Sequence, residues 1–106
     1  MGNSGDFSIG SKVWPGTSKL IEEMGELQQV LGKLMGTAGQ AAHWDGTDLR
    51  ERLIDELADL QAAINFFQGK NLTTADDDRI ERRRCEKLHT FCAWHEKQVP
   101  LPEEPA

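Results

Sequence analysis

The chain has 106 residues, of which 38% are hydrophobic and 28% are charged, so it is long enough for one domain and too short for two independent cores. Its 18 acidic and 12 basic residues give a formal net charge of −6, which argues against general nucleic-acid binding because neutralising phosphates requires clustered Lys and Arg. The sequence contains neither a membrane-length apolar run nor a secretory signal, since the N-terminus MGNSGDFSIG has no basic start and no apolar core. We therefore expect a cytoplasmic protein that binds neither nucleic acid nor a membrane.

The first segment with a regular pattern is a predicted helix that ends near Met35. Residues 1–13, rich in Gly and Ser, are expected to form a flexible N-terminal segment before it. Thr17 and Ser18 are candidates for its N-cap, and Gly36 is a candidate for a left-handed C-cap. Apolar residues recur at steps of 4, 3, 4 and 3, which places them on one helical face: Leu20, Met24, Leu27, Leu31 and Leu34.

A second predicted helix follows the loop 36–47, which contains Trp44. Asp48 and Glu51 have the spacing of a capping box, and Gly69 is the predicted end of the helix. The same steps of 4, 3, 4 and 3 connect its predicted core residues: Leu53, Leu57, Leu60, Ile64 and Phe67.

A third predicted helix begins with Thr74 as its N-cap and runs to about Lys97. Its first half is rich in Arg and its second half is apolar. Cys85 and Cys92 lie seven residues apart, about 10.5 Å along a helix, which is too far for a disulfide between them. We expect both to be reduced thiols and small buried residues on one helix face. Residues 98–106, rich in Pro, are expected to form a disordered tail.

These patterns predict an all-α fold, a helical bundle of three main helices in one domain over residues 14–97. The first two helices are expected to form an antiparallel hairpin. Because three helices bury only a modest core, we expect a second copy to complete the bundle, as a homodimer or a homotetramer.

Two pairs of acidic residues share one position relative to the predicted core, because each directly precedes an apolar core residue. The pairs are Glu23 with Glu26 and Glu56 with Asp59. Equal offsets bring both pairs to the same side of an antiparallel hairpin, where like charges need a cation or shifted pKa values. Oxygen ligands suit Mg²⁺ or Mn²⁺, whereas Zn²⁺ favours His and Cys. The alternative is a solvated acidic face without a ligand.

The same residues carry a family resemblance. Glu22-Glu23-Met24-Gly25-Glu26, followed by Glu56-Leu57-Ala58-Asp59, resembles the EExxE…ExxD signature of the all-α nucleoside triphosphate pyrophosphohydrolases. More narrowly, the chain resembles small MazG-like proteins in the stretches WPGTSKLIEEMGELQQVLGKL and HWDGTDLRERLIDELADLQAAINFF and in the spacing Arg83…Lys87…Phe91…Trp94. Together these cover roughly residues 13–95.

The resemblance implies hydrolysis of an NTP or dNTP to the monophosphate and pyrophosphate. It implies Mg²⁺, with Mn²⁺ as a substitute, held by four residues: Glu23, Glu26, Glu56 and Asp59. Glu22 would support the site or orient the attacking water, and Arg83 with Lys87 would bind the triphosphate. Trp14 and Trp44 are candidates for stacking on the base.

Lys33 is seven residues from Glu26 and on its side of the first helix, which allows a phosphate-binding or counter-charge role. Two other functions remain open. Phosphoribosyl-ATP pyrophosphohydrolases share the helical signature, and a non-catalytic helical adaptor would use the apolar stripes for oligomerisation and the acids against wrong partners.

Overall fold

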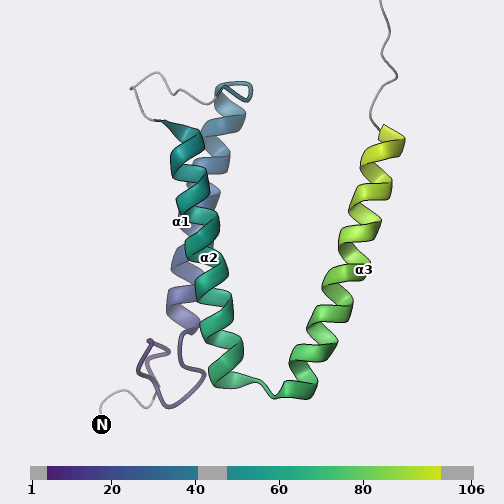
Figure 1. The fold of residues 1–106 in the computed structure, drawn as a ribbon. Helices are drawn as coiled ribbons and strands as arrows, with labels where there is room; N and C mark the ends of the chain where they lie inside the picture. Colours follow the sequence, from purple (N-terminus) through teal and green to yellow (C-terminus); the bar gives the residue numbers. More distant parts are fainter. Residues whose placement is uncertain (1–4, 41–47, 99–106) are drawn as a thin grey trace, which may run out of the picture. The chain divides into compact units, whose positions relative to one another are not determined.

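The protein is described by a computed structural model over residues 5–40 and 48–98, and these residues contain three helices (Figure 1). The helices are α1 (Thr17–Gly36), α2 (Leu49–Asn71) and α3 (Thr74–Gln98). Neither described range contains a β-strand, so the all-α prediction is confirmed. The prediction for Trp44 and that for the tail from residue 99 onward lie outside the described residues.

The predicted hairpin is present, because α1 and α2 lie side by side and run in opposite directions (Figure 1). Between them is a narrow apolar seam in which Val30 and Leu49 are fully buried and Ala63 is nearly so. This seam is the core of the hairpin, and any polar side chain on the same helical faces must enter it.

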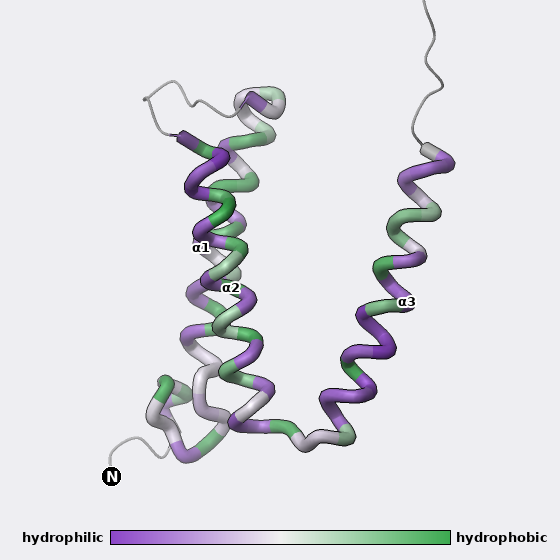
Figure 2. The backbone as a smooth tube through the Cα atoms, in the orientation of Figure 1, coloured by the Kyte–Doolittle hydropathy of each residue, from purple (hydrophilic) through white to green (hydrophobic). Residues whose placement is uncertain are grey.

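The position of the seam corrects the predicted core. Leu20, Leu27 and Leu34 of the expected α1 stripe are half-buried, but the alternate residues of both expected stripes are exposed. Apolar residues recur along the whole of α1 and α2 (Figure 2), and two helices can cover only one edge of so broad an apolar face. The uncovered residues, here called the outer apolar stripe, are Ile21, Met24, Leu31 and Met35 on α1 and Ile54, Leu57 and Ile64 on α2.

The ends of α1 also differ from the prediction. Its N-cap is Gly16, at φ 89°, rather than Thr17 or Ser18. The helix continues through Gly36, and the left-handed residues are Ala38 and Gly39. The chain reverses at that later point because the amide of Gly39 donates to the carbonyl of Leu34 at 2.7 Å.

At the start of α2 the predicted cap is confirmed, because the amide of Glu51 donates to the Asp48 carboxylate at 3.1 Å. The helix passes Gly69 and ends at Asn71. In α3, Thr74 is the first helical residue rather than the cap. The residue before it, Thr73, exchanges side-chain hydrogen bonds with Asp76 and caps the helix.

The segment that precedes α1 is bonded to the hairpin in its described part, residues 5–16. The amide of Gly16 donates to the carbonyl of Ser8, and the amide of Ser18 donates to the carbonyl of Phe7, both at 2.8 Å. The side-chain amide of Asn71 donates to the carbonyl of Pro15 at 2.9 Å and so joins the segment to the end of α2. Residues 1–13 are predicted from the sequence to be flexible, and in their described part Phe7 and Ser8 accept backbone hydrogen bonds from the start of α1.

The chain divides into two compact units, with the boundary between Leu72 and Thr73. The first unit contains the hairpin and the N-terminal segment, and the second unit contains α3. From the sequence, all three helices are predicted to lie in one domain. Taken by itself, α3 exposes its large apolar residues, and Cys85 and Cys92 are free and exposed rather than buried. None of the helices in the described ranges combines the length and apolar character that a bilayer crossing requires.

We predict opposite effects on stability for two glycine substitutions in this region. A Cβ at Gly16 would lie 2.8 Å from the Phe66 ring in a left-handed conformation, so Gly16→Ala is expected to destabilise the protein by about 1–3 kcal/mol. Nothing lies within 4 Å of a Cβ at Gly32, so Gly32→Ala should stabilise it by up to about 1 kcal/mol. Urea unfolding followed by circular dichroism measures both effects. A Gly16→Ala protein as stable as the wild type would contradict the described packing.

Candidate metal centre

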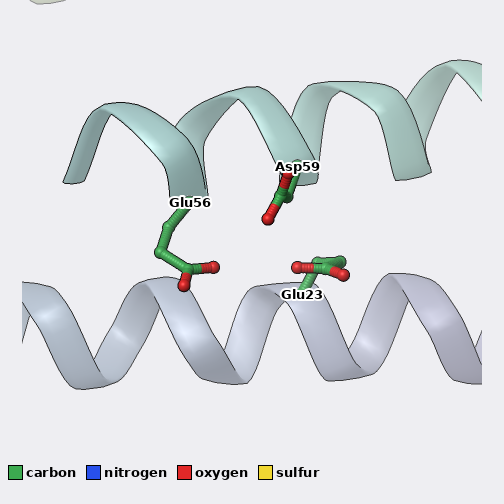
Figure 3. Close-up of side chains that lie close together, drawn as sticks. All are labelled: Glu23, Glu56 and Asp59. Carbon is green, nitrogen blue, oxygen red and sulfur yellow. The ribbon is translucent and has the colours of Figure 1, made fainter. Parts of the chain in front are cut away.

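Three acidic side chains from the two helices of the hairpin converge at the seam. One oxygen each of Glu23, Glu56 and Asp59 lies within 4.8 Å of the other two. Figure 3 shows Glu56 and Asp59 extending from α2 toward α1, and Glu23 at the facing surface of α1. The structure therefore brings together three of the four residues predicted to bind a metal.

The repeated spacing of the two helices explains this convergence. On each helix, acidic residues lie seven and four positions before a buried apolar residue of the seam. The two sets are Glu23, Glu26 and Val30 on α1 and Glu56, Asp59 and Ala63 on α2. Positions separated by three, four or seven residues share a helical face, so the acidic residues lie on or beside the packed face.

Two carboxylate oxygens in this group are buried without a partner. Oε1 of Glu23 and Oε1 of Glu56 accept a hydrogen bond from no group of the described chain. The Glu56 side chain is only 14% exposed, and its neighbouring cation, the Arg52 guanidinium, lies 4.0 Å away and is itself partly exposed. Buried, unpartnered oxygens are unfavourable in the folded state, and a divalent cation at this point would supply the missing interaction.

The local environment shifts the pKa of both glutamates upward. For Glu23 and for Glu56 the main cause is desolvation, and the charge of Glu26 and then that of Asp59 raise each pKa further. Lys19 opposes the shift at Glu23, and Arg52 opposes it at Glu56. The site therefore favours either a proton or a metal cation over a set of free carboxylates.

The remaining acidic residues of the predicted site have different places. Glu26 is half-buried and acts electrostatically on Glu23 and Glu56, but it is not a member of the closest group of three. Glu22 is exposed and accepts a hydrogen bond from Lys19. Glu26 thus belongs to the edge of the acidic site, whereas Glu22 is bound to a surface lysine.

The predicted aromatic and first-helix substrate residues are also outside the group of three. The indole of Trp14 stacks on the ring of Phe67, with centroids 5.9 Å apart, and lines a surface pocket with Lys12 and Lys70. Lys33 is half-buried in the last turn of α1. Neither residue is among those that line the pocket adjoining the acidic group, described below.

The two predicted triphosphate-binding residues, Arg83 and Lys87, lie on α3 in the second unit. They are one helical turn apart and can act on one anion. The ammonium of Lys87 lies 5.6 Å from the centroid of the Phe91 ring, which holds this end of the side chain against an aromatic surface. Their role in binding substrate stays a prediction.

A pocket beside the acidic group contains residues that the sequence prediction missed. Its lining consists of Ile9, Lys19, Glu23, Asp59, Ala62, Ala63 and Phe66. Periodicity could have indicated two of them, because Lys19 is four residues before Glu23 and Phe66 is seven after Asp59. Ile9 could not be found in this way, since it is brought there by the turns before α1.

Comparison of the chain with protein-family models, with curated proteins and with solved structures finds no match.

We predict that Glu56→Gln raises the metal-free melting temperature at pH 7. A raised pKa means that the folded protein binds the proton of Glu56 more tightly than the unfolded chain does, so ionisation opposes folding as the pH rises above the unfolded pKa. The gain should therefore shrink as the pH falls through the folded pKa and disappear below about 4.5, the ordinary value. Thermal unfolding in EDTA from pH 4 to 8 measures this difference.

Asp55→Asn provides the matched control, because Asp55 is exposed on α2 and lies outside the group of three. It should show no comparable gain. A Glu56→Gln protein less stable than the wild type at pH 7 would mean that Glu56 is held by a favourable structural pairing.

Proposed function

We propose that the protein is a Mg²⁺-dependent nucleoside triphosphate pyrophosphohydrolase of the MazG-like type, with its metal site at the seam of the hairpin. The observation that carries this proposal is the pair of buried, unpartnered oxygens of Glu23 and Glu56 within a convergent group of carboxylates. The family resemblance stated from the sequence supports the reaction, since the residues that converge are those that it implies as metal ligands.

The residues present fit Mg²⁺ or Mn²⁺. The nearest donors are all carboxylate oxygens, from Glu23, Glu56 and Asp59, with Glu26 at the edge. Such a set suits a hard cation that keeps positions for water and phosphate oxygens. When bound, Mg²⁺ would neutralise phosphate charge and polarise the phosphoryl group for attack.

In the proposed reaction the carboxylates of the chain also handle the proton. A water oxygen forms a bond to the α-phosphorus, the bond from that phosphorus to the bridging oxygen breaks, and pyrophosphate leaves with the electron pair. The proton of the water passes to a carboxylate outside the closest group of three, either Glu26 at the edge of the acidic site or the exposed Glu22 on α1. A carboxylate within hydrogen-bond reach of the attacking water can accept its proton as a general base.

Cationic side chains are proposed to bind the phosphate chain. Lys19 lines the pocket with Glu23 and Asp59, and the hydrogen bond and charge of Glu22 raise its pKa, so it is positively charged at neutral pH. Lys33, Arg83 and Lys87 are retained as further candidates from the sequence. Lys19 would balance charge on the leaving pyrophosphate.

We further propose that a second copy of the chain covers the outer apolar stripe. The stripe runs along both helices of the hairpin and includes Ile21, which is 60% exposed, and Met35, which is 82% exposed. A second copy presents the same stripe, and an isologous contact between two such stripes would complete a bundle. The proposed assembly is therefore a homodimer, or a homotetramer built from two such dimers. We also propose that the protein is cytoplasmic.

The proposed activity is tested by measuring the release of pyrophosphate. Release of pyrophosphate should be detected with at least one member of a panel of NTPs and dNTPs in Mg²⁺, and EDTA should abolish it. Glu56→Gln and Asp59→Asn should each lower kcat by at least about 100-fold, since each removes a charged ligand from the site. Asp55→Asn should retain activity within about twofold.

The same panel separates the alternatives. Hydrolysis confined to phosphoribosyl-ATP would indicate that activity instead. An adaptor would release no pyrophosphate from any compound, and the outer apolar stripe would then be its functional surface.

The proposed oligomer is tested by measuring the sedimentation of the protein. Sedimentation velocity at about 50 µM should show a dimer or tetramer for the wild type. Ile64→Lys should shift the protein toward the monomer, because it places a charge in the outer apolar stripe, whereas the adjacent exposed Asn65→Lys should not. A wild type that sediments as a stable monomer would contradict the proposed pairing.

A further inference from the structure

A pocket of about 480 Å³ adjoins the acidic group, within the size range of small-molecule sites. Glu23 and Asp59 belong both to the acidic group and to the lining of this pocket. A molecule held by a cation at the acidic group would therefore have this pocket directly beside it.

The lining of the pocket combines charged and apolar side chains. Its charged side chains are Glu23 and Asp59 and the ammonium-bearing Lys19, whereas the rest of the surface comes from apolar side chains: Ile9, Ala62, Ala63 and Phe66. No amide or hydroxyl side chain is among the lining residues. The pocket therefore offers apolar contact and one aromatic ring, but no neutral side chain that would read a hydrogen-bonding pattern.

The aromatic ring is held in place from two directions. Gly16 packs so closely on it that a Cβ there would lie 2.8 Å from Cδ2 and 2.9 Å from Cε2 of Phe66. The ammonium of Lys70 lies 5.8 Å from the ring centroid. These contacts order Phe66 in advance, so little side-chain entropy remains to be lost when a second ring packs against it.

The part of the lining that Ile9 supplies is ordered by backbone hydrogen bonds. Ile9 follows Phe7 and Ser8, whose carbonyls accept hydrogen bonds from the amides of Ser18 and Gly16. The N-terminal segment therefore contributes an ordered residue, Ile9, to the lining of the pocket.

We propose that this pocket holds the nucleobase of the triphosphate substrate, packed against Phe66 and Ile9, and that it accepts purines and pyrimidines alike. This inference rests on the proposed function. Every base has an apolar face that can stack on an aromatic ring, so stacking is tolerant of base identity. Strong discrimination needs buried polar groups that a wrong base would leave unpaired, and the side chains around the apolar part of the pocket provide none.

Binding measurements test the pocket independently of catalysis. The probes are α,β-imido-dATP and α,β-imido-dCTP, which resist hydrolysis at the scissile bond, and inorganic tripolyphosphate, which has no base. Isothermal titration calorimetry in Mg²⁺ gives the Kd of each for the wild type, Phe66→Leu and Phe67→Leu. Leucine keeps an apolar side chain at either position, and thermal unfolding checks that each variant is folded.

We expect the wild type to bind the two nucleotide analogues with Kd values within about fivefold of each other. Phe66→Leu should weaken the binding of both analogues by at least about 5-fold, the lower end of the range for a lost base–aromatic stack, and change tripolyphosphate binding by less than twofold. Phe67→Leu is the matched control, since Phe67 is the next residue of α2 but stacks on Trp14 outside the pocket.

Several results would overturn the inference. They are an unchanged nucleotide Kd in Phe66→Leu, an equal loss for tripolyphosphate, a wild type that prefers one base by more than 100-fold, or no nucleotide binding at all. Loss of nucleotide binding in Phe67→Leu alone would place the base on Trp14 instead. If the analogues bind as expected but no dNTP is hydrolysed, the pocket stands and the proposed catalytic function fails.

Discussion

Repulsion between carboxylates at a packed helix seam is the constraint on which the rest of this structure depends. Glu23 and Glu56 occupy the same helical faces as Val30 and Ala63, where an apolar residue would stabilise the hairpin. Desolvation and the neighbouring acids raise their pKa, and two of their oxygens have no partner in the described chain. The acidic group therefore lowers the stability of the folded hairpin, and a bound cation that neutralises the group would raise that stability.

The placement of these acids also explains the two surfaces of the hairpin. Val30 and Ala63 are buried in the seam, and the acidic groups that share their helical faces meet there from both helices. The larger apolar side chains are left outside in the outer apolar stripe. The seam side of the broad apolar face therefore carries the acidic group, and the outer apolar stripe is available for contact with a second copy of the chain.

Much of this could be predicted from the sequence. The capping-box spacing located the Asp48 cap, and periodicity located the three helices and the side of the hairpin on which the acids meet. It could not locate the seam, because a broad apolar face is compatible with contact through either Met24 or Glu23, and hydropathy favours Met24. The path of residues 5–16 depends on a left-handed Gly16 and on non-local hydrogen bonds, so Ile9 and the pocket that it lines were not predictable from spacing.

Cation binding by the acidic group is measured by titrating the metal-free protein with Mn²⁺ and following the electron paramagnetic resonance signal of free Mn²⁺. We expect the wild type to remove Mn²⁺ from solution with sub-millimolar affinity and to release it to excess Mg²⁺. The double variant Glu23→Gln/Glu56→Gln should leave the free signal unchanged, whereas Glu51→Gln/Asp55→Asn, on the exposed surface of α2, should bind like the wild type. An equal free-Mn²⁺ signal for the wild type and for Glu23→Gln/Glu56→Gln would contradict the central claim.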